Sequence, residues 1–191
     1  MGKLISRVLN ALSRIEAKIV LIGLDSAGKT AIIKRLKYVD ESSIDTRITV
    51  GFSATDLEIG SLKINCYDIG GQKTFRNLWN YYYDDTDAVV FVIDSADVNR
   101  LNCGGVGCEE GCVKCVLHES LSDPRLAECT VLLLINKQDL PDALDPREVV
   151  KVVELDKLTQ TWFAQPCSAL NDVRSIYLGF DWLANELKRR K

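Results

Sequence analysis

The sequence predicts an α/β fold with a mostly parallel central sheet, one antiparallel strand and helices on both faces. From Lys18 onward, short apolar runs alternate with stretches of helical periodicity, as strand-helix-strand crossovers do. The 191 residues are 47% apolar and 27% charged, which suits one domain with a full hydrophobic core. A glycine-bounded loop joins the first expected strand to the first crossover helix. These observations predict a sheet that binds its ligand at one edge.

The chain begins with an expected amphipathic helix. Its apolar positions recur at steps of three to four residues: Leu4, Ile5, Val8, Leu9, Leu12 and Ile15. We assign residues 1–17 to this helix and residues 18–191 to the globular domain. In the domain we expect strands at 18–23, 52–59, 62–68, 87–94, 130–136 and 162–167, and helices at 29–39 and 173–189. The Gly60-Ser61 step predicts a two-residue hairpin turn, which makes the second strand antiparallel to the third.

The loop "GLDSAGKT" matches the pattern GxxxxGK[ST] directly between an expected strand and an expected helix. Glycines at its two ends let the backbone N–H groups turn inward, and the helix N-terminus adds a partial positive charge. Lys29 would reach the outer phosphates, and the Thr30 hydroxyl would bind Mg²⁺. The candidate phosphate-binding residues are Gly23, Leu24, Asp25, Ser26, Ala27, Gly28, Lys29, Thr30 and Ala31.

The segment "NKQD", Asn136 to Asp139, ends an apolar strand and indicates a guanine site. The Asp139 carboxylate can accept from both N–H donors on the guanine edge, whereas adenine would leave this acid unpaired. Asn136 would brace the loops, and the Lys137 stem would lie along the base. After a later strand, Ser168 and Ala169 follow Cys167, placed to offer the base oxygen a backbone N–H.

The segment "YDIGGQ", Tyr67 to Gln72, carries the residues expected for hydrolysis. Asp68 would hold Mg²⁺ through water, Gly71 could donate its N–H to a terminal phosphate, and Gln72 could orient the attacking water as the catalytic residue. Thr49 is placed to add a second metal ligand when the third phosphate is present. We therefore expect GTP or GDP with Mg²⁺, and slow turnover because no arginine in these motifs is placed to aid catalysis.

Taken together, the chain resembles the ADP-ribosylation factor family of small GTPases, including its Arf-like branch. The segments that carry the resemblance span almost the whole chain: "MGKLIS", "GLDSAGKT", "TVGF", "YDIGGQ", "RNLWNYYY", "VIDSAD", "NKQDLPDA" and "GFDWL". The resemblance implies a P-loop GTPase fold and a monomeric switch that is off with GDP and on with GTP. It also implies a guanine-nucleotide exchange factor, a GTPase-activating protein, and effector or coat proteins in vesicle traffic. Phe52, Tyr67 and Tyr82 would form the aromatic effector patch.

The amino end predicts a membrane anchor. Gly2 and Ser6 satisfy MGxxx[ST], the pattern for N-myristoylation of Gly2. One myristoyl chain binds bilayers only marginally, so the basic amphipathic helix would supply the required second signal. We expect a cytoplasmic protein that associates reversibly with the Golgi or another endomembrane.

Composition excludes other classes. The net charge of −3 argues against nucleic-acid binding, and no apolar run approaches the roughly 20 residues of a membrane span. Two alternatives stay open. A nucleotide-loaded scaffold would exchange GTP but hardly hydrolyse it, and a P-loop kinase or ATPase would retain ATP and need no guanine loop.

The segment 101–119 interrupts the alternation with glycines and cysteines. Its thiol and imidazole side chains could form a tetrahedral zinc site, with ligands from among Cys103, Cys108, Cys112, Cys115 and His118. Only Cys112 and Cys115 have CxxC spacing, so we favour a glycine-rich surface loop leading into a shortened helix, with Cys115 and Leu117 in the core. Elsewhere Cys66 and Cys167 are expected to be buried apolar residues on strands.

Overall fold

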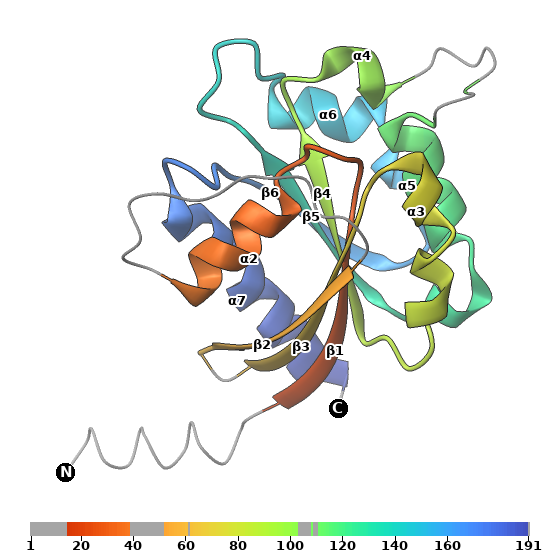
Figure 1. Ribbon diagram of the computed structural model, residues 1–191, viewed down its shortest axis with the longest axis vertical. Coiled ribbons are helices and arrows are strands. Elements are labelled where there is room, and N and C mark those ends of the chain that lie inside the picture. Colours follow the sequence, from red (N-terminus) through yellow and green to blue (C-terminus); the bar gives the residue numbers. More distant parts are fainter. Residues whose placement is uncertain (1–14, 39–51, 61, 103–107, 109–110, 191) are drawn as a thin grey trace.

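The computed structural model describes residues 15–38, 52–60, 62–102, 108 and 111–190. Within these ranges a six-stranded sheet has the order β2-β3-β1-β4-β5-β6 (Figure 1). All neighbouring strands are parallel except the β2–β3 pair, so the expected mostly parallel sheet with one antiparallel strand is confirmed. The strands are β1 (Ile15–Ile22), β2 (Phe52–Ile59), β3 (Leu62–Ile69), β4 (Ala88–Asp94), β5 (Thr130–Asn136) and β6 (Thr161–Pro166).

Helices cover both faces of the sheet (Figure 1). The α-helices are α2 (Lys29–Lys37), α3 (Lys73–Arg76), α4 (Val98–Leu101), α5 (Val113–Leu121), α6 (Pro146–Val152) and α7 (Val173–Arg190). Three short 3₁₀ turns are η1 (Trp79–Tyr82), η2 (Pro124–Leu126) and η3 (Leu155–Lys157). No helix in the described part of the chain is long and apolar enough to cross a membrane.

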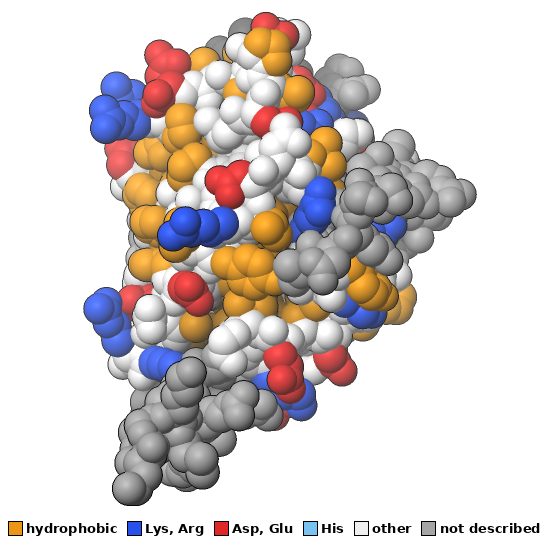
Figure 2. All heavy atoms as spheres, turned by 90° about the vertical axis from the view of Figure 1, so that its left-hand side faces the viewer, with side chains coloured by type: hydrophobic (Ala, Val, Ile, Leu, Met, Phe, Trp, Pro, Cys, Tyr) orange, Lys and Arg blue, Asp and Glu red, His pale blue; other side chains and the backbone are white. Residues whose placement is uncertain are grey.

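The core lies in two layers, one on each side of the sheet. On one side, α2 and α7 pack against alternate residues of β1 and β3, including Ile19 and Ile64. On the other side, α5, α6 and the buried Trp79 pack against the residues between, such as Val20. The inner strand β5, between β4 and β6, is buried along its whole length because helices cover both of its faces. On the α2 and α7 face, hydrophobic side chains reach the surface among scattered charges of both signs (Figure 2).

The first strand begins earlier than expected. Residues Ile15 to Ala17, assigned from the sequence to the amphipathic helix, belong to β1, where they pair with Leu62 to Ile64 of β3. Burial alternates here, with Ile15 and Ala17 buried and Glu16 exposed, which is the period of a strand. The carboxylate of Glu16 forms an ion pair with the ammonium group of Lys63 at 2.8 Å. The helix boundary at residue 17 is therefore wrong, and residues 1–14 lie outside the described ranges.

The hairpin between β2 and β3 agrees with the sequence. Ile59 pairs with Leu62 across the turn, and Gly60 has φ +60°, the left-handed conformation that the leading glycine of such a turn permits. Each functional segment then follows the carboxyl end of a parallel strand: the phosphate loop follows β1, "GGQ" follows β3, and "NKQD" begins at the end of β5. This topology brings the candidate motifs to one edge of the sheet.

Candidate nucleotide and magnesium site

The phosphate loop runs from Gly23 to Thr30 and is held from two sides. Ser26 and Gly28 have positive φ values of 61° and 99°, which curl the loop. A Cβ atom at Gly28 would lie only 2.3 Å from the side-chain nitrogen of Asn136, so the close approach of the "NKQD" strand requires glycine. The nine-residue α2 begins with no side-chain cap and no acidic residue in its first turn. The partial positive charge of this helix N-terminus therefore suits an anion.

Lys29 lies inside this loop. Its side chain is almost fully buried, and the ammonium group donates to the Gly23 and Leu24 carbonyl oxygens at 2.9 Å each. Burial lowers the pKa of Lys29 to about 8, although the carboxylates of Asp68 and Asp25 act in the opposite direction. A bound phosphate would raise this pKa again, because it supplies a negative partner for the desolvated cation.

Oxygen donors for a metal meet beside the lysine. The Thr30 hydroxyl, on the first turn of α2, donates to a carboxylate oxygen of Asp68 at the end of β3, over 2.6 Å. A hydroxyl and a carboxylate in contact are the hard ligands that Mg²⁺ prefers, so these residues fit the ion expected from the sequence. Thr49, the other expected ligand, lies outside the described residues.

Asn136 joins the phosphate loop to the later loop. Its side chain is buried, donates to the Ala27 carbonyl oxygen at 2.8 Å and accepts from the Ala169 N–H at 3.0 Å. The segment from Cys167 to Ala169 was expected to offer the base oxygen a backbone N–H, and within that segment the Ala169 N–H donates to Asn136. The two loops are fixed by one side chain, as the brace expected of Asn136 requires.

Charged residues line the side of the site where the sequence predicts a guanine base. The Lys137 ammonium pairs with Asp94 at 2.6 Å, and residue 137 has a φ of 67°. Asp139 is exposed and accepts from the Asn171 side chain at 3.1 Å. Ser168 is buried, and its hydroxyl accepts the Asn171 N–H at 3.0 Å.

These segments enclose a cavity of about 430 Å³, the size expected for a small-molecule site. Most of its lining was predicted: Asp25, Ser26, Gly28, Lys29, Thr30, Ala31, Gly71, Asn136, Lys137, Asp139 and Ala169. Leu140 and Leu170 complete the wall and were missed. Both are exposed apolar side chains, which suit the flat faces of a base. Only the fold shows that their two loops line the same cavity. Gly23, Leu24, Ala27, Asp68, Gln72 and Ser168 lie outside this lining.

The segment after β3 lies against the phosphate loop. A Cβ atom at Gly71 would lie 2.3 Å from the Leu24 carbonyl carbon and 2.4 Å from the Asp25 nitrogen, so two backbones touch here. The Arg76 guanidinium donates to the Gly71 carbonyl oxygen at 2.9 Å, and the Trp79 indole donates to Gly70 at 3.1 Å. Gln72 follows at once and is half-buried, at the residue before α3.

Another missed residue is Arg100 on α4. Its guanidinium donates to the Asp25 carboxylate of the phosphate loop at 3.0 Å and to Asp97 at 2.6 Å. Asp97 and Arg100 are three residues apart on one helical turn, which is a visible signal. The contact with Asp25 spans 75 residues and is set only by the fold.

The three aromatic residues of the expected effector patch lie together. Tyr82 contacts both others, with ring centroids 5.5 Å from Phe52 and 5.3 Å from Tyr67. Phe52 has 57% of its surface exposed, which is unusual for phenylalanine. The patch joins β2 and β3 to η1, the turn that follows α3.

The cysteine-rich segment differs in part from expectation. Leu117 is buried as expected, but Cys112 is the buried cysteine and Cys115 is only partly covered, because Cys112 caps the N-terminus of α5 under the following turn. The His118 ring donates to the Val153 carbonyl oxygen at 2.8 Å. Among the described residues, His118 does not join Cys108, Cys112 and Cys115, whose thiols lie close to one another. Cys103 lies outside the described residues. Cys66 and Cys167 are buried strand or strand-end residues, as predicted.

Comparison with known proteins agrees with this geometry. The model of the ADP-ribosylation factor family matches residues 3–187. A similar solved structure is the Arl6 BBS3 small GTPase from Trypanosoma brucei with the bound nucleotide analogue GppNp. It is 29% identical with a TM-score of 0.79, and the match covers 93% of this chain and 100% of that one. The chain therefore belongs to the ADP-ribosylation factor family of small GTPases, which hydrolyse GTP.

Proposed function

We propose that this GTPase is a membrane-associating switch, which in its GTP state recruits effector or coat proteins for vesicle traffic and hydrolyses GTP slowly. The observation that carries the proposal is the contact between Gly71 and the phosphate loop. Gly71 lies backbone to backbone against Leu24 and is joined through Gln72 to α3 and through β3 to the aromatic patch. A terminal phosphate that accepts a hydrogen bond from the Gly71 N–H would therefore shift the surface that carries Tyr67 and Tyr82.

The nucleotide would be held by the cavity. Lys29 and the loop N–H groups would bind the phosphates, and Asp139 would accept the guanine N–H donors, with Leu140 and Leu170 beside the base. Thr30, Thr49 and, through water, Asp68 would hold Mg²⁺, which when bound neutralises phosphate charge. Gln72 would orient the attacking water, and a GTPase-activating protein would supply an arginine. An exchange factor would load GTP.

Membrane binding would come from the amino end. Gly2 fits the myristoylation pattern, and the apolar spacing from Leu4 to Leu12 fits a helix that lies in the bilayer surface. The β2–β3 hairpin would move along the sheet when GTP binds and thereby release this helix. A shift of two residues keeps each side chain on its own face of the sheet. We assign the protein to the Golgi or another endomembrane.

Liposome sedimentation tests this proposal. The myristoylated chain, loaded with GDP or with a non-hydrolysable GTP analogue, is mixed with anionic vesicles and centrifuged beside Gly2→Ala. We expect pelleting of the GTP-analogue form and its loss in Gly2→Ala. Equal pelleting of both nucleotide forms would contradict a membrane switch.

A further inference from the structure

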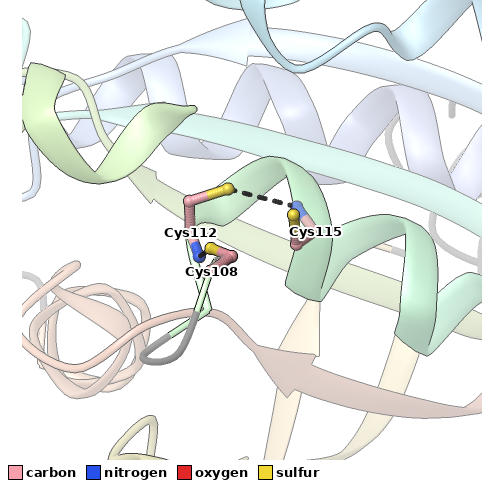
Figure 3. A group of neighbouring side chains, drawn as sticks. All are labelled: Cys108, Cys112 and Cys115. Atoms are coloured by element: carbon pink, nitrogen blue, oxygen red, sulfur yellow. Dashed lines mark hydrogen bonds between the residues drawn. The ribbon is translucent and has the colours of Figure 1, made fainter. Parts of the chain in front are cut away.

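Three thiols gather outside the cavity that the candidate nucleotide motifs line. The Sγ atoms of Cys108, Cys112 and Cys115 all lie within 4.8 Å of one another. Figure 3 shows one thiol on the chain before α5, one at the N-cap of α5 and one on its first turn. The three cysteines are three or four residues apart, about one turn of the chain, so their side chains lie on the same side.

The local backbone holds two of these sulfurs in place. The Cys112 N–H donates to Cys108 Sγ at 2.8 Å, and the Cys115 N–H approaches Cys112 Sγ at 3.5 Å (Figure 3). Each contact links one cysteine of the cluster to the backbone of the next, so the three residues are held together. Gly111, with φ +72°, makes the turn that returns the chain from Cys108 to Cys112.

The other described cysteines are poor competitors for a metal. Cys66, Cys129 and Cys167 are buried on or beside the sheet, and burial raises the pKa of each thiol to about 12. They remain protonated and out of reach of solvent. Among the described thiols, the cluster alone combines mutual proximity with partial exposure.

We propose that Cys108, Cys112 and Cys115 form a thiolate site for a soft divalent metal ion such as Zn²⁺, and that its occupancy is coupled to Gly71, which contacts the phosphate loop. Each coordinating thiol would release its proton to solvent. A Zn–S distance of about 2.3 Å places the sulfurs of a tetrahedral site about 3.8 Å apart, so they need to approach by at most about 1 Å. The fourth position would be open to water or an exogenous ligand.

The coupling runs through Gly111. A Cβ atom there would lie 2.7 Å from a terminal nitrogen of Arg76, so the chain between two of the ligands touches this guanidinium. Arg76 in turn donates to the Gly71 carbonyl oxygen at 2.9 Å. Arg76, Cys108 and Gly111 also share the wall of a groove of about 570 Å³ between α3 and α5. A metal that fixes Cys108 against Cys112 would fix the surface against which Arg76 rests.

Two readouts separate metal binding from coupling. First, the reduced, GDP-bound chain is titrated with Zn²⁺ against a chromophoric chelator, beside Cys112→Ser, Cys115→Ser and Cys129→Ser. We expect one ion per chain in the wild type and in Cys129→Ser, and at least a hundredfold weaker binding in both cluster variants, since even ligand-supporting groups contribute about 10- to 100-fold. Replacement by Co²⁺ should give a sulfur-to-metal charge-transfer band. No wild-type binding, or undiminished binding in the cluster variants, would overturn the site.

Second, release of a fluorescent GDP is followed with and without Zn²⁺ at constant Mg²⁺. We expect at least a fivefold change in rate, and its loss in Arg76→Ala at unchanged zinc stoichiometry. An unchanged rate in the wild type would overturn the coupling. This readout rests on the proposed switch, whereas the zinc titration does not, so failure of either is distinguishable. Oxidation that consumes two cluster thiols while zinc does not bind would instead indicate a disulfide and refute the metal site.

Discussion

The side chain of Asn136 offers the sharpest test of how the site is held together. Asn136→Ala removes the donor to the Ala27 carbonyl and the acceptor of the Ala169 N–H, and both partners are in buried segments. Each of the two buried groups left without a partner costs about 1–3 kcal/mol, so we expect a loss of about 2–6 kcal/mol from the free energy of unfolding. That is a large part of the roughly 5–15 kcal/mol that stabilises a typical domain.

Urea unfolding at one fixed GDP concentration measures this loss. With an m-value of about 2 kcal/mol/M, the midpoint should fall by about 1–3 M, and release of fluorescent GDP should accelerate. Asn171→Ala is the matched control, because its side-chain amide donates to the exposed Asp139 at the protein surface, and it should change stability by less than about 0.5 kcal/mol. A midpoint for Asn136→Ala equal to that of the control would refute the reasoning.

Three other perturbations follow from the same geometry. Burial lowers the pKa of Lys29 to about 8, so above pH 8 nucleotide binding is accompanied by uptake of a proton. The affinity for GDP should therefore fall by up to about tenfold per pH unit between about pH 8 and pH 10.5. Lys29→Met should lack this pH dependence. The lowered pKa also decreases the free energy of unfolding of the nucleotide-free protein below pH 8. This decrease disappears as the pH rises to about 10.5, so the urea midpoint should be higher at pH 9.5 than at pH 7.5. Gly71→Ala forces a Cβ atom to 2.3 Å from the Leu24 backbone and should reduce GTP-analogue affinity at least tenfold, measured by fluorescence titration; unchanged affinity would show that this contact yields. Tyr82→Ala removes the ring that contacts Phe52 and should abolish capture of GTP-specific partners while leaving GDP release within about twofold; retained capture would place the effector surface elsewhere.

Local patterns predicted most of the fold because the chain alternates cleanly between periods of two and 3.6 residues. Strands β2 and β5 have the expected bounds, and the two-residue hairpin lies at Gly60. At Ile15 the same apolar residue fits both a helical and a strand period, and pairing with β3 decides for the strand. Helix α6 was not predicted, although Asp145 before Pro146 is a typical helix start and the Asp145 carboxylate accepts the Arg147 N–H at 2.8 Å.

The candidate site could be predicted where a motif is contiguous. Lys29, Thr30 and Asn136 each stand in a recognisable segment, and the fold brings those segments to one cavity. Leu140 and Arg100 were missed because their roles depend on which loops face each other across the sheet edge. The convergence of Cys108 with Cys112 depends on the turn at Gly111, which sequence spacing alone does not reveal.

The most direct measurement of the central claim is single-turnover GTP hydrolysis by the wild type and by Gln72→Leu. A hydrolytic switch predicts slow conversion of bound GTP by the wild type, a rate at least about tenfold lower in Gln72→Leu, and no turnover of ATP in either. Equal GTP hydrolysis by the two proteins would contradict the role of Gln72. It would favour a nucleotide-loaded scaffold over a switch that turns itself off.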